Sequence, residues 1–160
     1  MPDLLGHQTQ LGFLHSALRA GRLSHAYLFV GPGGIGKRLV AEQLARRILC
    51  LKPDGERPCG VCQNCKFQLS QHPNAKLLGY EGGINSSTRL KIYGEQSRTI
   101  KIDEIRDLKR FFQLTPFSGS VRVVILDNAH QCTQEAANAF LKLLEEPPQD
   151  SYFFLITSSP

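Results

Sequence analysis

The segment Gly31–Arg38 reads GPGGIGKR, and seven of its eight positions fit the phosphate-binding pattern G-x-x-x-x-G-K-[ST]. In that pattern the eighth residue is a Ser or Thr whose hydroxyl holds Mg²⁺ beside a bound nucleotide. This chain has Arg38 at that position. The loop therefore keeps the glycines and the lysine that bind phosphate, but it lacks a ligand for the metal.

The sequence on both sides of this loop supports the interpretation. Ala26–Val30 is a short apolar run that predicts a buried strand, and the apolar residues from Leu39 to Ile48 recur at helical spacing. A strand, a glycine loop and a helix in this order direct backbone N–H groups toward an anion. The alternative is a turn whose glycines only supply positive φ angles. The candidate phosphate-binding residues are Gly31, Gly33, Gly34, Gly36 and Lys37.

Strand and helix patterns alternate along the rest of the chain. Helical spacing is found at residues 7–20, after Ile102 and after Thr133, a candidate N-cap, whereas residues 75–80, 121–126 and 152–157 read as strands. Residues 81–99 are polar and predict a loop or a hairpin. In the helix after Thr133 the expected buried stripe is Ala137, Phe140, Leu141 and Leu144. This alternation predicts an α/β fold, a parallel sheet with helices on both faces.

The second half of an ATPase site should be an acidic pair at the end of another strand. Asp127 follows the apolar run VVIL and stands where a metal-binding aspartate belongs. The next residue, where a glutamate would activate water, is Asn128, and an amide cannot act as that base. The alternative role for Asp127 is to cap a turn. His130 is read as a capping or packing histidine rather than a phosphate contact. Arg38 and Asn128 thus leave phosphate binding open and predict no turnover.

Four of the five cysteines, Cys50, Cys59, Cys62 and Cys65, are spaced C-x8-C-x2-C-x2-C. Two C-x2-C steps through a turn rich in Pro and Gly place thiolates around one point, which predicts a structural zinc site in an insertion at residues 50–74. Iron–sulfur ligation and four unrelated thiols are the alternatives. Cys132 lies outside the cluster and is read as an ordinary thiol.

Composition limits the class of protein. The 160 residues suffice for one domain with a small insertion, or for a piece of something longer. The longest apolar runs are strand-sized and no export signal is visible, so we expect no membrane partner and a cytoplasmic location. The formal charge of +5 would suit a phosphate-rich partner but does not identify one.

Five segments form a recognisable series: SHAYLFVGPGGIGK, the four-cysteine insertion, VILD before NAH, AANAFLKLLEEPP and FFLITSSP. Together they resemble the N-terminal domain of the bacterial sliding-clamp loader subunits, which are AAA+ proteins of DNA polymerase III. The resemblance implies a P-loop NTPase (AAA+, RecA-like) sheet with strand order 5-1-4-3-2, of which this chain supplies strands 1 to 4. Residues 1–160 would then be an incomplete, C-terminally truncated nucleotide-binding-type domain that lacks the lid, the helical collar and an arginine finger expected beyond Pro160.

The resemblance also has functional implications. In this family gamma and tau keep an intact P-loop and an Asp-Glu pair, whereas delta-prime is a stator that does not hydrolyse ATP. Arg38 and Asn128 group the chain with delta-prime, which implies weak ATP binding or none and no catalytic residue of its own. Ser158 corresponds to the polar sensor position, for which Thr157 and Ser159 compete.

The implied partners are the delta and gamma/tau subunits in a hetero-pentamer. The sliding clamp and primer-template DNA would be reached through this complex, a nucleotidyltransferase assembly of DNA replication. Two other functions stay open, an active ATPase of the gamma/tau type and a zinc-dependent nucleic-acid-binding module.

Overall fold

The computed structural model describes residues 6–52, 58–79 and 99–158. In this part of the chain four parallel strands form one sheet in the order β1-β4-β3-β2. For strands 1 to 4 this is the order that the resemblance implies. Of the predicted loop or hairpin at residues 81–99, only Thr99 lies within the described residues. The strands are β1 (Ala26–Val30), β2 (Ala75–Leu78), β3 (Arg122–Leu126) and β4 (Ser151–Thr157).

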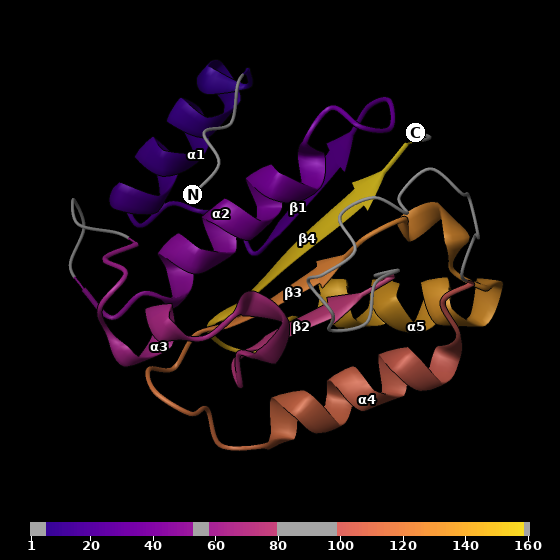
Figure 1. Cartoon of the computed structure of the whole chain (residues 1–160). Coiled ribbons are helices and arrows are strands. Elements are labelled where there is room, and N and C mark those ends of the chain that lie inside the picture. The colour runs from indigo at the N-terminus through magenta and orange to yellow at the C-terminus, as the bar shows by residue number, and fades with distance from the viewer. Residues whose placement is uncertain (1–5, 53–57, 80–98, 159–160) are drawn as a thin grey trace, which may run out of the picture.

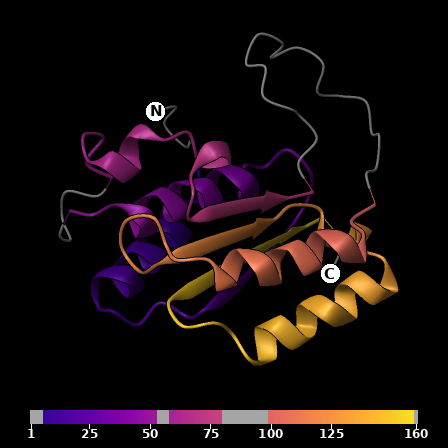
Figure 2. The ribbon, with the colours of Figure 1, turned by 90° about the horizontal axis from the view of Figure 1, so that it is seen from below.

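Helices cover both faces of the sheet, as predicted (Figures 1 and 2). The helices α1 and α2 pack on one face, where Leu44 and Phe154 belong to the core, and α4 and α5 pack on the other, around Phe153. Between α2 and β2 the chain forms the short helices α3 and η1. The helix bounds are α1 Gln8–Arg19, α2 Lys37–Leu49, α3 Gln63–Lys66, η1 Leu69–Gln71, α4 Ile102–Gln113, η2 Ala129–Gln131 and α5 Gln134–Glu145.

The strand β3 has the strongest apolar pattern, and it is buried throughout at the centre of the sheet. The strand β1 is an edge of the described sheet, as the implied order 5-1-4-3-2 without strand 5 predicts, although its apolar run alone predicted a buried strand. It pairs with β4 alone among the described strands, and Leu28 and Val30 are 59% and 47% exposed. Tyr27 and Phe29 point to the opposite face and pack on the core. An apolar run does not distinguish an edge strand from a central one here, because the sequence AYLFV is apolar on both faces of the strand although β1 is only partly covered.

Two helices differ from their predicted buried stripes. In α5 the buried residues are Ala136, Phe140 and Leu143, and Leu141 is 54% exposed, so the prediction was wrong at Leu141. Two adjacent stripes of α5 are both apolar, and only the direction from which the sheet approaches selects one of them. In α2 Leu39 is exposed, although the other apolar positions of this helix are buried.

The predicted caps and ends of helices agree better with the structure. Thr133 caps α5, since its Oγ1 accepts a hydrogen bond from the Ala136 N–H at 3.2 Å. The helix α4 begins next to Asp103 and Glu104, and the Glu104 carboxylate accepts a hydrogen bond from the Lys101 N–H at 3.3 Å. No helix in the described ranges is both long enough and apolar enough to cross a bilayer.

Candidate functional site

A cavity of about 330 Å³ lies at the carboxyl ends of the parallel strands, where α/β sheets bind ligands. The loop between β1 and α2 and the end of β4 meet there (Figure 1). The structure thus gathers residues from three distant segments, and most of the predicted phosphate-site residues line one space. The lining residues are Gly33, Gly34, Gly36, Lys37, Arg38, Asp127, Asn128, Ile156, Thr157 and Ser158.

The glycines shape the loop that forms one wall of this cavity. Gly31, Gly34 and Gly36 have φ angles of 153°, 79° and 91°. Gly36 is the N-cap of α2 and stands in the left-handed region, where a side chain would strain the backbone. Gly31 does not line the cavity, but its carbonyl accepts a hydrogen bond from Lys37 Nζ at 2.5 Å. The Pro32 carbonyl accepts a second one at 2.6 Å, so the Lys37 ammonium holds the loop closed on itself.

Arg38 and Asp127 form an ion pair across this cavity. Arg38 Nη1 is 3.8 Å from Asp127 Oδ2, and Arg38 Nε donates to Glu42 Oε1 at 3.0 Å, one turn further along α2. Burial raises the pKa of the Asp127 carboxyl, while the Arg38 guanidinium, the Asn128 N–H and Lys37 offset part of that effect. Among the described residues, the Arg38 guanidinium is thus the cation nearest to the Asp127 carboxylate.

Asn128 follows Asp127 in a left-handed backbone conformation, with φ 53° and ψ 49°. Its N–H donates to the carboxylate of Asp127 at 3.0 Å. Opposite this turn lies Gly79, where a Cβ atom would stand 1.9 Å from the Asp127 carbonyl oxygen. The end of β3 is therefore fixed by close backbone packing, and no carboxylate follows Asp127 to serve as a base.

Thr157, rather than Ser158, makes the specific contact at the end of β4. The hydroxyl of Thr157 lies 3.2 Å from Nδ1 of His130, and Thr157 is buried whereas Ser158 is exposed. Both residues line the cavity, so the end of β4 lies beside the glycine loop. Sequence reasoning missed this contact of His130, because the two residues are far apart in the chain.

The four predicted ligand cysteines converge in the insertion. The Sγ atoms of Cys50, Cys59, Cys62 and Cys65 all lie within 4.8 Å of one another. Two of these separations are 4.0 Å, from Cys50 to Cys62, and 3.9 Å, from Cys59 to Cys65. A tetrahedral zinc with Zn–S bonds of about 2.3 Å requires sulfurs roughly 3.8 Å apart. The donor set therefore fits zinc, and Cys132 is not part of it.

Backbone groups are already arranged to stabilise thiolates in this cluster. The Cys62 N–H lies 3.3 Å from Cys59 Sγ, and hydrogen bonds from the Cys62 and Val61 backbone lower the pKa of the Cys59 thiol. Burial acts to raise the pKa of Cys62, but hydrogen bonds from the Leu51 and Cys65 backbone and from neighbouring thiols lower it to about 6. Burial raises the pKa of Cys65 to about 12. Bound Zn²⁺ would favour the thiolate at all four positions.

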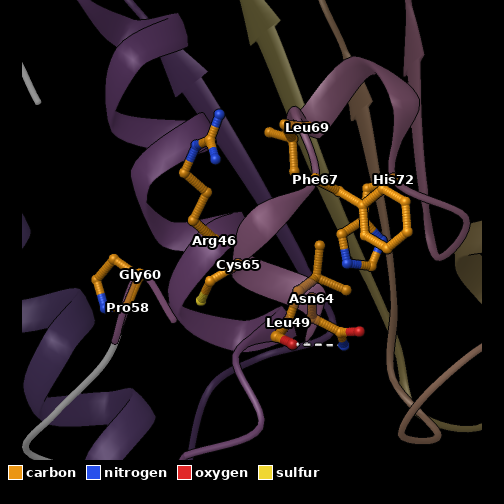
Figure 3. A pocket seen from close by; sticks show the side chains of 9 residues that line it. All are labelled: Arg46, Leu49, Pro58, Gly60, Asn64, Cys65, Phe67, Leu69 and His72. Carbon is orange, nitrogen blue, oxygen red and sulfur yellow. Dashed lines mark hydrogen bonds between the residues drawn. The ribbon is translucent and has the colours of Figure 1, made fainter. Parts of the chain in front are cut away.

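The buried residues Asn64 and Asn74, with the carbonyls that they contact, form a polar platform beside the cysteine cluster. Figure 3 shows Asn64 near Cys65 and its hydrogen bond to Leu49. Asn64 donates from Nδ2 to the carbonyls of Leu49 and Ser118, at 2.8 Å and 3.0 Å, and Asn74 donates to the same Ser118 carbonyl at 3.2 Å. The Phe67 ring stands edge-on to Phe117, with centroids 5.6 Å apart. These contacts join the insertion to the loop that precedes β3, and no sequence motif signals them.

Beside the platform lies a small cavity of about 30 Å³, drawn in Figure 3. It is lined by Cys65, Asn64 and His72, among others. The Asn74 N–H donates to His72 Nδ1 at 3.0 Å, which requires this nitrogen to be unprotonated. Burial, followed by the nearby Arg46 cation, lowers the pKa of His72. The neutral form of this histidine is thus part of the platform.

Comparisons with known proteins agree with this description. The chain is 35% identical to the DNA polymerase III subunit tau of Escherichia coli over 158 residues, and 38% identical to the delta' subunit of Pseudomonas aeruginosa over 138 residues. These matches cover 99% and 86% of this chain, but only 22% and 38% of the relatives. The chain therefore spans about a fifth to two fifths of their length.

The fold and the family are supported independently. A gamma subunit-related DNA polymerase III protein of Thermotoga maritima has a similar fold, with a TM-score of 0.58, 24% identity and coverage of 93% of this chain and 39% of that one. The family described as "DNA polymerase III, delta subunit" matches residues 6–160. The chain accordingly belongs to this family, as the N-terminal region of a clamp-loader subunit of the group that contains gamma, tau and delta-prime.

Proposed function

We propose that the chain is the nucleotide-binding-type domain of a clamp-loader subunit that does not hydrolyse ATP, a stator of the delta-prime kind. The observation that carries the proposal is the pair formed by Arg38 and Asp127, 3.8 Å apart. Where a P-loop ATPase holds a metal between a hydroxyl and an aspartate, this chain holds a guanidinium against the aspartate. Asn128 at the base position supports the same conclusion.

In this proposal the glycine loop has a structural task. Its backbone joins the edge strand β1 to α2, and Lys37 fastens the loop through the carbonyls of Gly31 and Pro32. The cysteine cluster would hold a structural zinc, which cross-links the insertion and supplies no chemistry to the cavity. The rest of the subunit, the lid and collar, would assemble with delta and gamma/tau into a pentamer that places the sliding clamp on primer-template DNA.

The alternative is an active subunit of the gamma/tau type, and the similarity to tau over nearly the whole chain favours it. An ATPase assay on the purified full-length subunit separates the two. We expect no turnover above the buffer background in the presence of Mg²⁺. Turnover that persists through purification and disappears in Lys37→Ala would contradict the stator and support the motor. Turnover that Lys37→Ala leaves unchanged would be a contaminant.

Assembly is a separate test of the proposal. The full-length subunit, mixed with delta and gamma/tau, should co-elute as one complex in gel filtration, and Lys37→Ala should leave the elution volume unchanged. An unaltered complex is expected because the loop lysine contacts its own backbone. Failure of the wild-type subunit to enter the complex would contradict the assignment to the clamp loader.

A further inference from the structure

Magnesium does not fit the corner of the cavity in which a P-loop site would bind it. Mg²⁺ takes oxygen ligands at about 2.0–2.1 Å in octahedral geometry. The two protein residues that surround that position in P-loop sites, the Ser or Thr and the aspartate, correspond here to Arg38 and Asp127. A guanidinium offers no lone pair to a metal and repels a divalent cation.

The guanidinium of Arg38 is held in place from two sides. Nε donates to Glu42 at 3.0 Å on the same helix, and Nη1 faces Asp127 at 3.8 Å on the neighbouring strand end. The side chains of Glu42 and Asp127 are 23% and 14% exposed, so both carboxylates are partly shielded from water. The Arg38 side chain is itself 43% exposed, but both of its ion pairs hold the guanidinium at the cavity wall.

Among the side chains that line the cavity the cations outnumber the carboxylates, and Glu42, which pairs with Arg38, is not one of the lining residues. Lys37 and Arg38 are adjacent residues that line the cavity, and Asp127 is the one carboxylate among its lining residues in the described chain. A planar guanidinium can donate two parallel hydrogen bonds to a phosphate group. The loop glycines Gly33 and Gly34 place backbone next to the same space.

We propose that Arg38 takes the place of the metal, so that this cavity binds the phosphate groups of a nucleotide without Mg²⁺ and Mg²⁺ weakens the binding. The inference deepens the proposed function and rests on it for the class of ligand, a nucleoside triphosphate or diphosphate. Complexation with Mg²⁺ lowers the negative charge of the phosphates and brings a divalent cation next to the guanidinium. The cavity should consequently bind metal-free nucleotide more tightly than the Mg²⁺ complex of the same nucleotide.

The experiment is a calorimetric titration of the zinc-loaded protein with ATP, ADP and inorganic tripolyphosphate. Each ligand is tested with excess Mg²⁺ and in buffer freed of divalent cations by a resin, since a soluble chelator would also attack the cysteine cluster. For the wild type we expect binding in metal-free buffer and a severalfold weaker affinity with Mg²⁺. Tripolyphosphate binding would show that the phosphates suffice for recognition.

The Arg38→Thr variant restores the hydroxyl of the P-loop pattern. It should lose metal-free affinity by about tenfold or more, the usual effect of one hydrogen bond to a charged group, and its binding should become stronger with Mg²⁺. Arg38→Gln provides a second variant without the charge, should Arg38→Thr fail to fold. Arg106→Thr is the matched control, because it removes an equal charge from an exposed position on α4 and should bind like the wild type.

Tighter binding of ATP with Mg²⁺ than without it in the wild type would overturn the inference. So would the absence of measurable binding under both conditions, which would leave the pair of Arg38 and Asp127 as a purely structural contact. Neither result touches the proposed stator, which fails only if the subunit hydrolyses ATP or does not assemble. The two conclusions can therefore be rejected separately.

Discussion

The phosphate corner, which comprises the glycine loop and the strand end at Asp127, retains a different part of a functional site than the cysteine cluster does. In the cysteine cluster all four ligand residues are present, and their sulfurs lie within 4.8 Å of one another. In the phosphate corner the backbone geometry is retained, with Gly36 at a φ angle of 91°, while the metal hydroxyl and the base are replaced by Arg38 and Asn128. The comparison teaches that the backbone shape of a site and its functional side chains are separable, since the glycine loop keeps its geometry although two residues of the ATPase pattern differ.

The largest effect is expected where the cysteine cluster is broken. Cys62→Ser should lower zinc affinity by more than the roughly 100-fold that loss of an outer-shell partner costs, because a direct ligand is removed. Zinc content by mass spectrometry should fall from about one per chain, and the wild type should show Zn–S distances of about 2.3 Å by X-ray absorption. Circular dichroism should show that the sheet remains folded.

Cys132→Ser is the matched control for this change, because Cys132 is a partly buried thiol outside the cluster. It should keep its zinc. If the wild-type protein is purified without chelator and contains no zinc, the predicted zinc site is contradicted. The difference drawn here between the two regions would then be lost.

A smaller effect should follow from disturbing the shape of the phosphate corner. Gly79→Ala combines a φ angle of 71° with a Cβ atom 1.9 Å from the Asp127 carbonyl oxygen. We expect the free energy of unfolding to fall by about 3 kcal/mol, from the left-handed strain and the backbone displacement together. Urea denaturation would measure it.

Gly21→Ala separates the two contributions to that cost. Gly21 has a φ angle of 62° and nothing within 4 Å of an added Cβ, so only strain of about 1 kcal/mol should remain. Equal losses in the two variants would mean that the contact between Gly79 and Asp127 does not hold the corner in shape.

The smallest expected effect concerns the platform under the cysteine cluster and its pH dependence. Because the pKa of His72 is lowered in the fold, the unfolded chain binds this proton first, with a pKa of about 6.5. The stabilisation is thus fully present above that pH and is lost as the pH falls toward the lower folded pKa. Protonation of Nδ1 would also displace the Asn74 N–H.

Between about pH 7.5 and about pH 5 the wild type should therefore lose about 1 kcal/mol more stability than His72→Gln. The comparison is of slopes, measured by denaturation at each pH, so any loss of zinc common to both proteins cancels. Parallel slopes would exclude His72 as the titrating group.

The sequence predicted those features that depend on local order. The glycine loop, the strand before Asp127 and the spacing of the cysteines are each contained within a few residues, and the structure has each of them. The strand order came from the resemblance. The exposed Leu141 could not be predicted, since helical spacing defines the stripes of α5 but not the one that faces the sheet.

The contacts that decide the chemistry of the candidate site were also beyond the sequence. Nothing in the order of residues shows that Arg38 reaches Asp127, because their distance depends on how α2 lies over the ends of the strands. For the same reason the sequence could not predict that Asn64 and Asn74 both donate hydrogen bonds to the Ser118 carbonyl. Such contacts join segments that are distant in the chain, and only the assembled sheet brings them together.

The left-handed backbone of Asn128 has an evolutionary consequence. Asn tolerates this conformation better than most residues, so a Glu placed there to act as base would start with a conformational penalty of about 1 kcal/mol. Replacing Arg38 alone would leave the partly buried Asp127 without its cation, and replacing Asn128 alone would add a second carboxylate to a pocket that lacks the metal-binding hydroxyl. For the proposed stator, a return to ATP hydrolysis would therefore need two substitutions, each unfavourable by itself.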